Sequence, residues 1–332
     1  MRFFANDNKK YADGGHGKMY EIRTDLALEA REKYEQDHVE IKGVRLEEQT
    51  VADDIRITTM VIETENGARS MGRPKGSYIT IEAASMDDED EHYHRIISEQ
   101  LAQLIRQLSP EGERLSALVV GLGNREVTSD SLGPKVVDRL FVTRHMMREF
   151  GADIFGKQQK QVSAIVPGVM AQTGMESSEI IRGILAETQP DFVIAVDALA
   201  ARSTRRLNRT IQITDTGIHP GSGVGNHRHP LTREALGIPV LAIGVPTVVD
   251  AATIVNDTMS NLLEALAEHA PYAQMKHSYR TLDEVEQYEL VRELLAPHLN
   301  TLYVTAKDID ASVDRLSVTV SDAINLALRE DS

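Results

Sequence analysis

Apolar and polar residues alternate with a period of two along the first third of the chain. The alternating stretches are residues 39–46, 55–63 and 77–82. Such alternation is typical of strands that bury one face and expose the other. Turn signals around Asn66-Gly67 and around Pro74 separate the last two stretches. The pattern therefore predicts a small antiparallel β layer at about residues 39–84.

From residue 115 onward the pattern changes to short apolar runs that alternate with segments of helical periodicity. Strands are predicted at 115–120, 161–166, 191–196, 209–214 and 239–244, and helices at 134–150, 176–187, 250–268, 283–296 and 308–329. Strands that alternate with helices form parallel sheets covered on both faces. The predicted fold class is α/β, with a mostly parallel central sheet and helices on both faces.

Two more helices are predicted before this region, at 26–37 and 92–107. From the residues alone, Thr24 or Asp25 fits the N-cap of the first helix, because a short polar side chain there accepts a free backbone N–H. Residues 1–20 are polar and Gly-rich and are expected to form a flexible tail. A long polar, Gly-rich stretch lies within 201–238, and loops of that kind often carry function.

Composition narrows the classes of function. The formal charge of −15 argues against direct nucleic-acid binding, which needs a basic surface. The absence of cysteine excludes disulfides, thiolate metal sites and a cysteine nucleophile. Neither a signal-peptide pattern nor an apolar run of transmembrane length is present, so a cytoplasmic protein without membrane partners is expected.

Two aspartates stand where predicted strands give way to loops. Asp197 closes the run Phe192-Val-Ile-Ala-Val-Asp197, and Asp130 lies in the loop that follows the strand at 115–120. The carboxyl ends of parallel strands form the crevice in which α/β folds usually bind ligands. Two carboxylates brought together there can share a proton, so that one acts as base and the other as acid.

Other motifs point less clearly to chemistry. Gly121-Leu-Gly123 follows a strand, but position 126 is Glu, so the dinucleotide-binding glycine pattern is incomplete. Ser222 lies in Pro220-Gly-Ser-Gly-Val224 without the strand and helix that flank a nucleophilic serine. His92 and His94 fit a solvated helix start better than a metal site. His227 and His229 leave a metal site open, although no nearby carboxylate set supports one.

The order of several long motifs resembles one family, the germination proteases of spore-forming bacteria. The matching stretches are residues 22–27 (Ile-Arg-Thr-Asp-Leu-Ala), 40–44, 76–83, 119–124, 130–134, 166–176, 195–202, 216–226, 237–250 and 304–310. The resemblance covers about residues 20–330. Residues 1–20 depart from the family pattern, since the tail is longer and its Gly-rich part has no counterpart.

The resemblance implies an endopeptidase that degrades small acid-soluble spore proteins during germination. It also implies an inactive zymogen that cleaves itself, a fold like that of hydrogenase maturation proteases, and a homotetramer in the spore core. The family's catalytic aspartates match Asp130 and Asp197. Its self-cleavage site matches the bond between Asp25 and Leu26, which gives a propeptide at 1–25 and a peptidase domain at 26–332.

The resulting hypothesis is a water-activating pair of aspartates that needs no cofactor. Backbone N–H groups near Gly121–Asn124 are candidates to stabilise an oxyanion. The residues expected to contact substrate are Gly121, Gly123, Asn124, His219 and Ser222. Two other classes stay open: a metal-dependent hydrolase that uses Asp130, Asp197 and a histidine of the 219–229 loop, and a non-enzymatic binding protein of the same fold.

Overall fold

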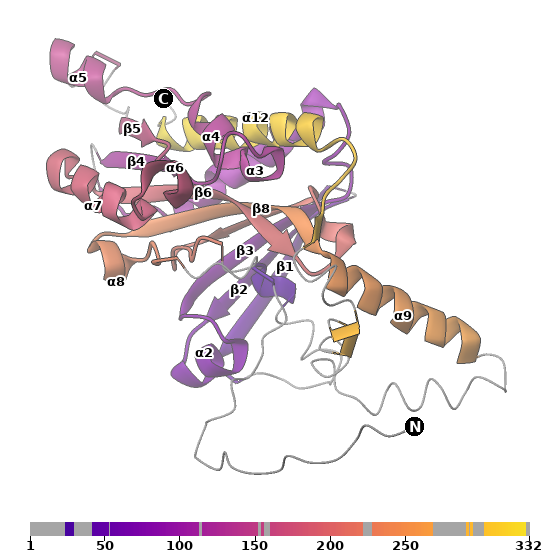
Figure 1. Cartoon of the computed structure of the whole chain (residues 1–332). Coiled ribbons are helices and arrows are strands. Elements are labelled where there is room, and N and C mark those ends of the chain that lie inside the picture. The colour runs from indigo at the N-terminus through magenta and orange to yellow at the C-terminus, as the bar shows by residue number, and fades with distance from the viewer. Residues whose placement is uncertain are drawn as a thin grey trace.

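The chain folds around one mixed β-sheet, seen in a computed structural model (Figure 1). The structure describes residues 24–29, 42–52, 54–112, 115–151, 154–155, 160–221, 228–267, 290–291, 293–294 and 302–329. The predicted flexible tail at 1–20 lies outside these residues, as does most of the helix predicted at 283–296. No helix in the described part of the chain is long and apolar enough to cross a membrane.

The sheet has the order β1-β2-β3-β7-β8-β6-β4-β5, with β9 paired to β8. The strands are β1 (Val44–Ala52), β2 (Ile55–Ile62), β3 (Gly76–Ala83), β4 (Ser116–Gly121), β5 (Gln161–Ile165), β6 (Phe192–Ala201), β7 (Thr210–Thr214), β8 (Val240–Asp250) and β9 (Tyr303–Val304). Strands β5, β4, β6 and β8 run parallel, which confirms the predicted parallel centre. The antiparallel strands β1, β2 and β3 continue the same sheet through β7.

Helices connect and cover these strands. They are α2 (Glu65–Met71), α3 (Glu91–Leu108), α4 (Leu132–Val137), α5 (Arg144–Phe150), α6 (Met170–Thr173), α7 (Ser177–Thr188), α8 (Arg233–Leu236), α9 (Ala251–Ala267) and α12 (Ile309–Leu328), with short 3₁₀ turns η1 (Thr128–Asp130) and η2 (Thr204–Arg206). Ala27–Glu29 are also helical, while the rest of the helix predicted at 26–37 lies outside the described residues.

Several predicted elements differ from the structure. The turn expected around Asn66-Gly67 is the helix α2, because the Thr64 hydroxyl caps it by accepting the Gly67 N–H and Gly72 ends it at a φ of 61°. Of the strand expected at 39–46, residues 39–41 lie outside the described residues, residues 42–43 form a turn, and the strand β1 runs from Val44 to Ala52.

The single helix predicted at 134–150 is two helices, α4 and α5. Tertiary contacts interrupt it, since the Phe141 N–H donates to Asn325 and the Thr143 N–H donates to the Val162 carbonyl. These amides are therefore not available to a continuous helix.

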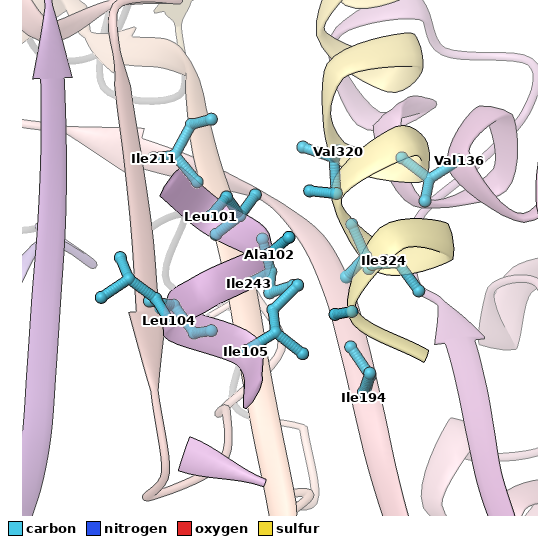
Figure 2. Packing of buried hydrophobic residues seen from close by; sticks show 14 of the residues in the cluster. Leu101, Ala102, Leu104, Ile105, Val136, Ile194, Ile211, Ile243, Val320 and Ile324 are labelled. Carbon is cyan, nitrogen blue, oxygen red and sulfur yellow. The ribbon is translucent and has the colours of Figure 1, made fainter. Parts of the chain in front are cut away.

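The largest core lies on one face of the sheet, under α3, α4 and α12. Figure 2 shows Leu101 and Ile105 of α3 and Ile324 of α12 pointing toward sheet residues such as Ile211 and Ile243. All five side chains are fully buried. Helix α12 packs along α3 and α4 on this face, so three helices cover it (Figure 1).

The opposite face is covered in a different way. At the β4 end, Ile181 of α7 packs against Leu118 and Val193. Toward the antiparallel strands, cover comes from the short N-terminal segment at 24–29, whose Leu26 and Ala27 are fully buried. This segment is central to the candidate site.

Candidate functional site

Asp130 ends the 3₁₀ turn η1, in the loop between β4 and α4. The loop closes tightly, because the Asn124 N–H donates to the Asp130 carbonyl at 3.0 Å. Gly123 makes this closure possible: its φ is 110°, and a Cβ there would lie 2.0 Å from the Asp130 carbonyl oxygen. The loop that carries Asp130 can therefore close in this way only with a glycine at position 123.

Asp197 lies inside β6 rather than at its end, which corrects the prediction that it closes a strand. The strand continues to Ala201, and Asp197 is in register with Gly244 of β8. Its side chain is on the same face as Val193, the face opposite the main core, and the residue is only 5% exposed. The Ala198 N–H donates to one carboxylate oxygen at 3.0 Å.

The two aspartates interact electrostatically. Burial raises the pKa of Asp197 well above its usual value of 3.8, and the negative charges of Asp130 and Asp25 raise it further. Burial also raises the pKa of Asp130. The positive charge of Arg228 opposes both shifts. These shifts favour a protonated Asp197, whose carboxyl group keeps its proton to higher pH than usual.

The N-terminal segment 24–29 lies against this region through its backbone. The Asp25 N–H donates to the Ala200 carbonyl at 3.1 Å, and the Ala200 N–H donates to the Asp25 carboxylate at 2.9 Å. Arg73 donates to the Thr24 carbonyl at 3.2 Å. The backbone of the segment is thus held from two sides, and the negative charge of the Asp25 carboxylate raises the pKa of Asp197.

Gln212 of β7 holds the segment on the other side of Asp25. Its Nε2 donates to the Asp25 carbonyl at 3.2 Å, and its Oε1 accepts the Ala27 N–H at 2.6 Å. The two contacts span the peptide bond between Asp25 and Leu26.

The side chains after that bond fill apolar pockets. Leu26 packs against Leu199 and Val249, and Ala27 packs in a separate cluster with Met60 and Tyr78. Both residues are fully buried. A larger side chain at position 27 would have no room without a shift of that cluster.

Glu29 is a buried carboxylate, only 3% exposed. It accepts the N–H groups of Arg202 at 2.8 Å and Ser203 at 3.0 Å, and it pairs with Arg206 at 3.4 Å. The Thr24 hydroxyl also donates to it. An acidic side chain four residues after the Asp25 carbonyl is therefore fully partnered, as a buried carboxylate must be.

A pocket of about 70 Å³ lies next to Asp25 of the segment. Its lining includes Asp25, Arg73, Tyr78, Gln212 and His219. Partial burial and the nearby charge of Arg73 lower the pKa of His219, although the residue as a whole is exposed. His219, predicted to contact substrate, thus stands beside the segment.

The glycines and amides of residues 121–124 have structural roles. A Cβ at Gly121 would lie 2.3 Å from the Gly133 carbonyl oxygen, so its small size lets β4 and α4 approach. The N–H of Leu122 donates to Val196 and that of Asn124 to Asp130, so these two amides are already occupied. The Asn124 side chain accepts from Glu126 and Gln172. Contact of Gly121, Gly123 and Asn124 with substrate stays a prediction.

The histidine and serine candidates divide into two groups. Ser222 and His227 lie outside the described residues. His94 contacts Thr319 and the Asp88 carbonyl, which agrees with a role at a helix start. Across the residues that the structure describes, no three His, Cys, Asp or Glu side chains gather closely enough to hold a metal ion.

The sequence did not mark several residues of this region, which are Glu29, Arg73, Arg206, Gln212 and Arg228. Each acts across strands or loops distant in sequence, so no local motif marks it. For Gln212 a signal existed, because it alternates with Ile211 and Ile213 and so must face the opposite side of the sheet from the main core.

Comparison with known proteins agrees with these features. The family model described as germination protease matches residues 21–277. Germination protease of Caldanaerobacter subterraneus is 45% identical over 93% of this chain and 94% of its own length. That of Clostridium perfringens is 44% identical over 94% and 96%, and that of Priestia megaterium 39% over 94% and 95%. This chain therefore belongs to the germination protease family and is a peptidase of spore germination.

Proposed function

We propose that this chain is an endopeptidase that degrades small acid-soluble spore proteins and is made as a self-processing zymogen. Residues 1–25 form the propeptide and 26–332 the peptidase domain, with Asp25–Leu26 as the bond that is cut. The observation that carries this proposal is the position of Asp25, whose carboxylate is close enough to Asp197 to raise its pKa. The segment 24–29 then occupies the place of a substrate.

The proposed chemistry uses Asp130 and Asp197 as an aspartic-type pair. Ionised Asp130 takes a proton from a water as the water oxygen attacks the Asp25 carbonyl carbon, and the carbonyl electrons move to oxygen. Protonated Asp197 then gives its proton to the Leu26 nitrogen as the C–N bond breaks. The direction of the pKa shifts supports this assignment, since burial favours the proton on Asp197.

The contacts of segment 24–29 also support a substrate class. A peptide that follows the path of this segment, helical from position 27 on, would fit if it carried an acidic residue before the bond, an apolar residue and Ala after it, and an acidic residue at the position of Glu29. Spore proteins that carry this pattern would replace the segment once it is cut. We place this activity in the spore core and expect a homotetramer.

The second candidate is a metal-dependent hydrolase that uses Asp130, Asp197 and a histidine of the 219–229 loop, although no three His, Cys, Asp or Glu side chains among the described residues gather closely enough to hold a metal ion. Chelation decides between the two. Self-processing and peptide cleavage that persist in excess EDTA support the aspartic pair. Activity that EDTA removes and a divalent metal restores supports the metal enzyme.

The function itself is tested with a purified small acid-soluble spore protein and the enzyme after it has been incubated at mildly acidic pH to trim itself. Mass spectrometry of the fragments should show cleavage after an acidic residue that is followed by an apolar residue and Ala. A matched substrate with Lys in place of the acidic residue should stay intact. Failure to cut any such protein, with the protease folded and trimmed, would contradict the proposed substrate.

A further inference from the structure

Gln212 is a buried polar residue on a sheet face, only 6% exposed. Its neighbours Ile211 and Ile213 enter the main core, while Gln212 faces the other side of β7. A buried amide is costly unless both of its ends form hydrogen bonds. Here both ends bond the backbone of the N-terminal segment, at Asp25 and at Ala27.

The orientation of the amide follows from its partners. The Asp25 carbonyl can only accept a hydrogen bond, so it must face the NH₂ group of Gln212, and the Ala27 N–H can only donate, so it must face the oxygen. A flipped amide would place donor against donor and acceptor against acceptor. These two hydrogen bonds of Gln212, called the clamp below, are therefore specific for a peptide backbone, whatever side chains the peptide carries.

The carbonyl that Gln212 contacts is the one attacked in the proposed reaction. As water adds to the Asp25 carbonyl carbon, negative charge develops on the carbonyl oxygen, and a donor that already points at that oxygen stabilises it most. The N–H groups of Leu122 and Asn124 donate to other carbonyls and are not free for this task. Gln212 Nε2, at 3.2 Å, is in place.

We propose that Gln212 is a catalytic residue that clamps the substrate backbone on both sides of the cut bond and donates a hydrogen bond to its oxyanion. The inference rests on the proposed function, since it takes Asp25–Leu26 as the bond that is cut. Any spore protein bound in place of segment 24–29 would make the same two contacts. Without a bound peptide the amide would lose both partners.

The test compares first-order rates of self-processing at mildly acidic pH by intact mass. Gln212→Met keeps the length of the side chain but makes neither hydrogen bond, and it should slow the reaction about 100-fold, as loss of an oxyanion donor usually does. The matched control is Thr210→Val, on the same face of β7. Within the described residues the buried Thr210 hydroxyl makes no hydrogen bond, so this variant should process at the wild-type rate.

A second variant separates the donor role from a packing role. In Gln212→Glu an ionised carboxylate would face the Asp25 carbonyl, whereas a protonated carboxyl can both donate and accept like the amide. The rate of this variant, divided by that of the wild type at the same pH, should rise as the pH falls. The same ratio for Gln212→Met should stay low at every pH. A Gln212→Met rate within threefold of the wild type would overturn the inference.

Hydrogen exchange at the Ala27 amide tests the clamp independently of the proposed function. In full-length Asp197→Asn protein the bond stays intact, and the Ala27 amide should be protected. Adding Gln212→Met should make that amide exchange at least tenfold faster. A wild type that never processes itself would overturn the proposed function and the oxyanion role together. The exchange rate of the Ala27 amide would still test the clamp. An unchanged Ala27 amide would overturn the clamp.

Discussion

The Asp25 carboxylate accepts the Ala200 N–H, and its negative charge raises the pKa of the buried Asp197 on the same strand, β6. The Ala200 N–H fixes the Asp25 carboxylate in this position, at 2.9 Å. The chain therefore carries an acidic side chain of its own N-terminal segment inside the candidate site. Several expected outcomes follow from this placement.

The pH profile of self-processing depends on this charge. The reaction needs one proton on the pair Asp130 and Asp197, so its rate should fall as rising pH removes that proton. Asp25→Asn removes a charge that raises the pKa of Asp197, so the falling limb should move to lower pH. Arg228→Gln removes a charge that lowers the pKa of both, so the limb should move to higher pH.

The profiles are measured by intact mass over a series of buffers at constant ionic strength. Lys135→Gln, a change of one charge at a residue whose ion-pair partner is Asp314, serves as the control. Limbs that do not move, or that move in the opposite directions, would show that these charges do not set the protonation of the pair.

Folding stability should change at Asp197. Because its pKa is raised on folding, the buried ionised carboxylate costs stability at neutral pH, and stability is regained as pH falls through the folded-state pKa. Asp197→Asn should therefore raise the free energy of unfolding at neutral pH by roughly 1–3 kcal/mol. The difference should vanish near pH 3.8, where the unfolded chain also takes up the proton. Urea unfolding at several pH values measures it.

The control variant should change the free energy of unfolding in the opposite direction. Arg125 lowers the pKa of Asp138, so the ionised carboxylate of Asp138 stabilises the fold. Asp138→Asn should cost under about 1 kcal/mol at neutral pH, because the ion pair is at the surface. An Asp197→Asn protein less stable than the wild type at neutral pH would contradict the raised pKa.

Glu29 should matter for docking of the segment. Glu29→Ala leaves the Arg202 and Ser203 N–H groups without their partner and removes an ion pair with Arg206. Self-processing should slow about tenfold, since each lost hydrogen bond to a charged group is worth about 1.5–3 kcal/mol and part of that loss is recovered by water. Glu48→Ala, at an exposed position of β1, should process normally. Equal rates for the two variants would remove Glu29 from the binding account.

Gly123 should be needed for the position of Asp130. Gly123→Ala combines a φ of 110° with a Cβ 2.0 Å from the Asp130 carbonyl oxygen, so the loop must shift. Activity should fall by more than 100-fold if Asp130 is displaced, because catalytic groups tolerate little misplacement. Gly174→Ala is the matched control, since it has a φ of 71° but no atom within 4 Å. It should cost about 1 kcal/mol of stability and leave activity intact.

The parallel centre of the sheet was predictable because its strands are continuous apolar runs separated by amphipathic helices. The break between α4 and α5 was not, because the contacts that cause it come from Asn325 and Val162, far along the chain. Helix α2 was mistaken for a turn since Gly67 is a poor helix former, yet the cap at Thr64 and a buried Met71 stabilise it.

Some residues of the candidate site were predictable from the sequence and others were not. Asp130 and Asp197 were found because each carboxylate interrupts or follows an apolar strand, a local signal. Gln212 and Arg228 were missed because their importance comes from the order of strands and from loops that meet only in three dimensions. No single sequence shows that β7 lies two strands from β6, which is what lets Gln212 reach the Asp25 carbonyl.

The most direct test of the aspartic pair is the intact mass of three full-length proteins after incubation at mildly acidic pH. They are the wild type, Asp130→Asn and Asp197→Asn. The wild type should lose residues 1–25, and both variants should stay whole while folding normally. A variant that is trimmed between Asp25 and Leu26 at the wild-type rate would contradict the role of the replaced aspartate.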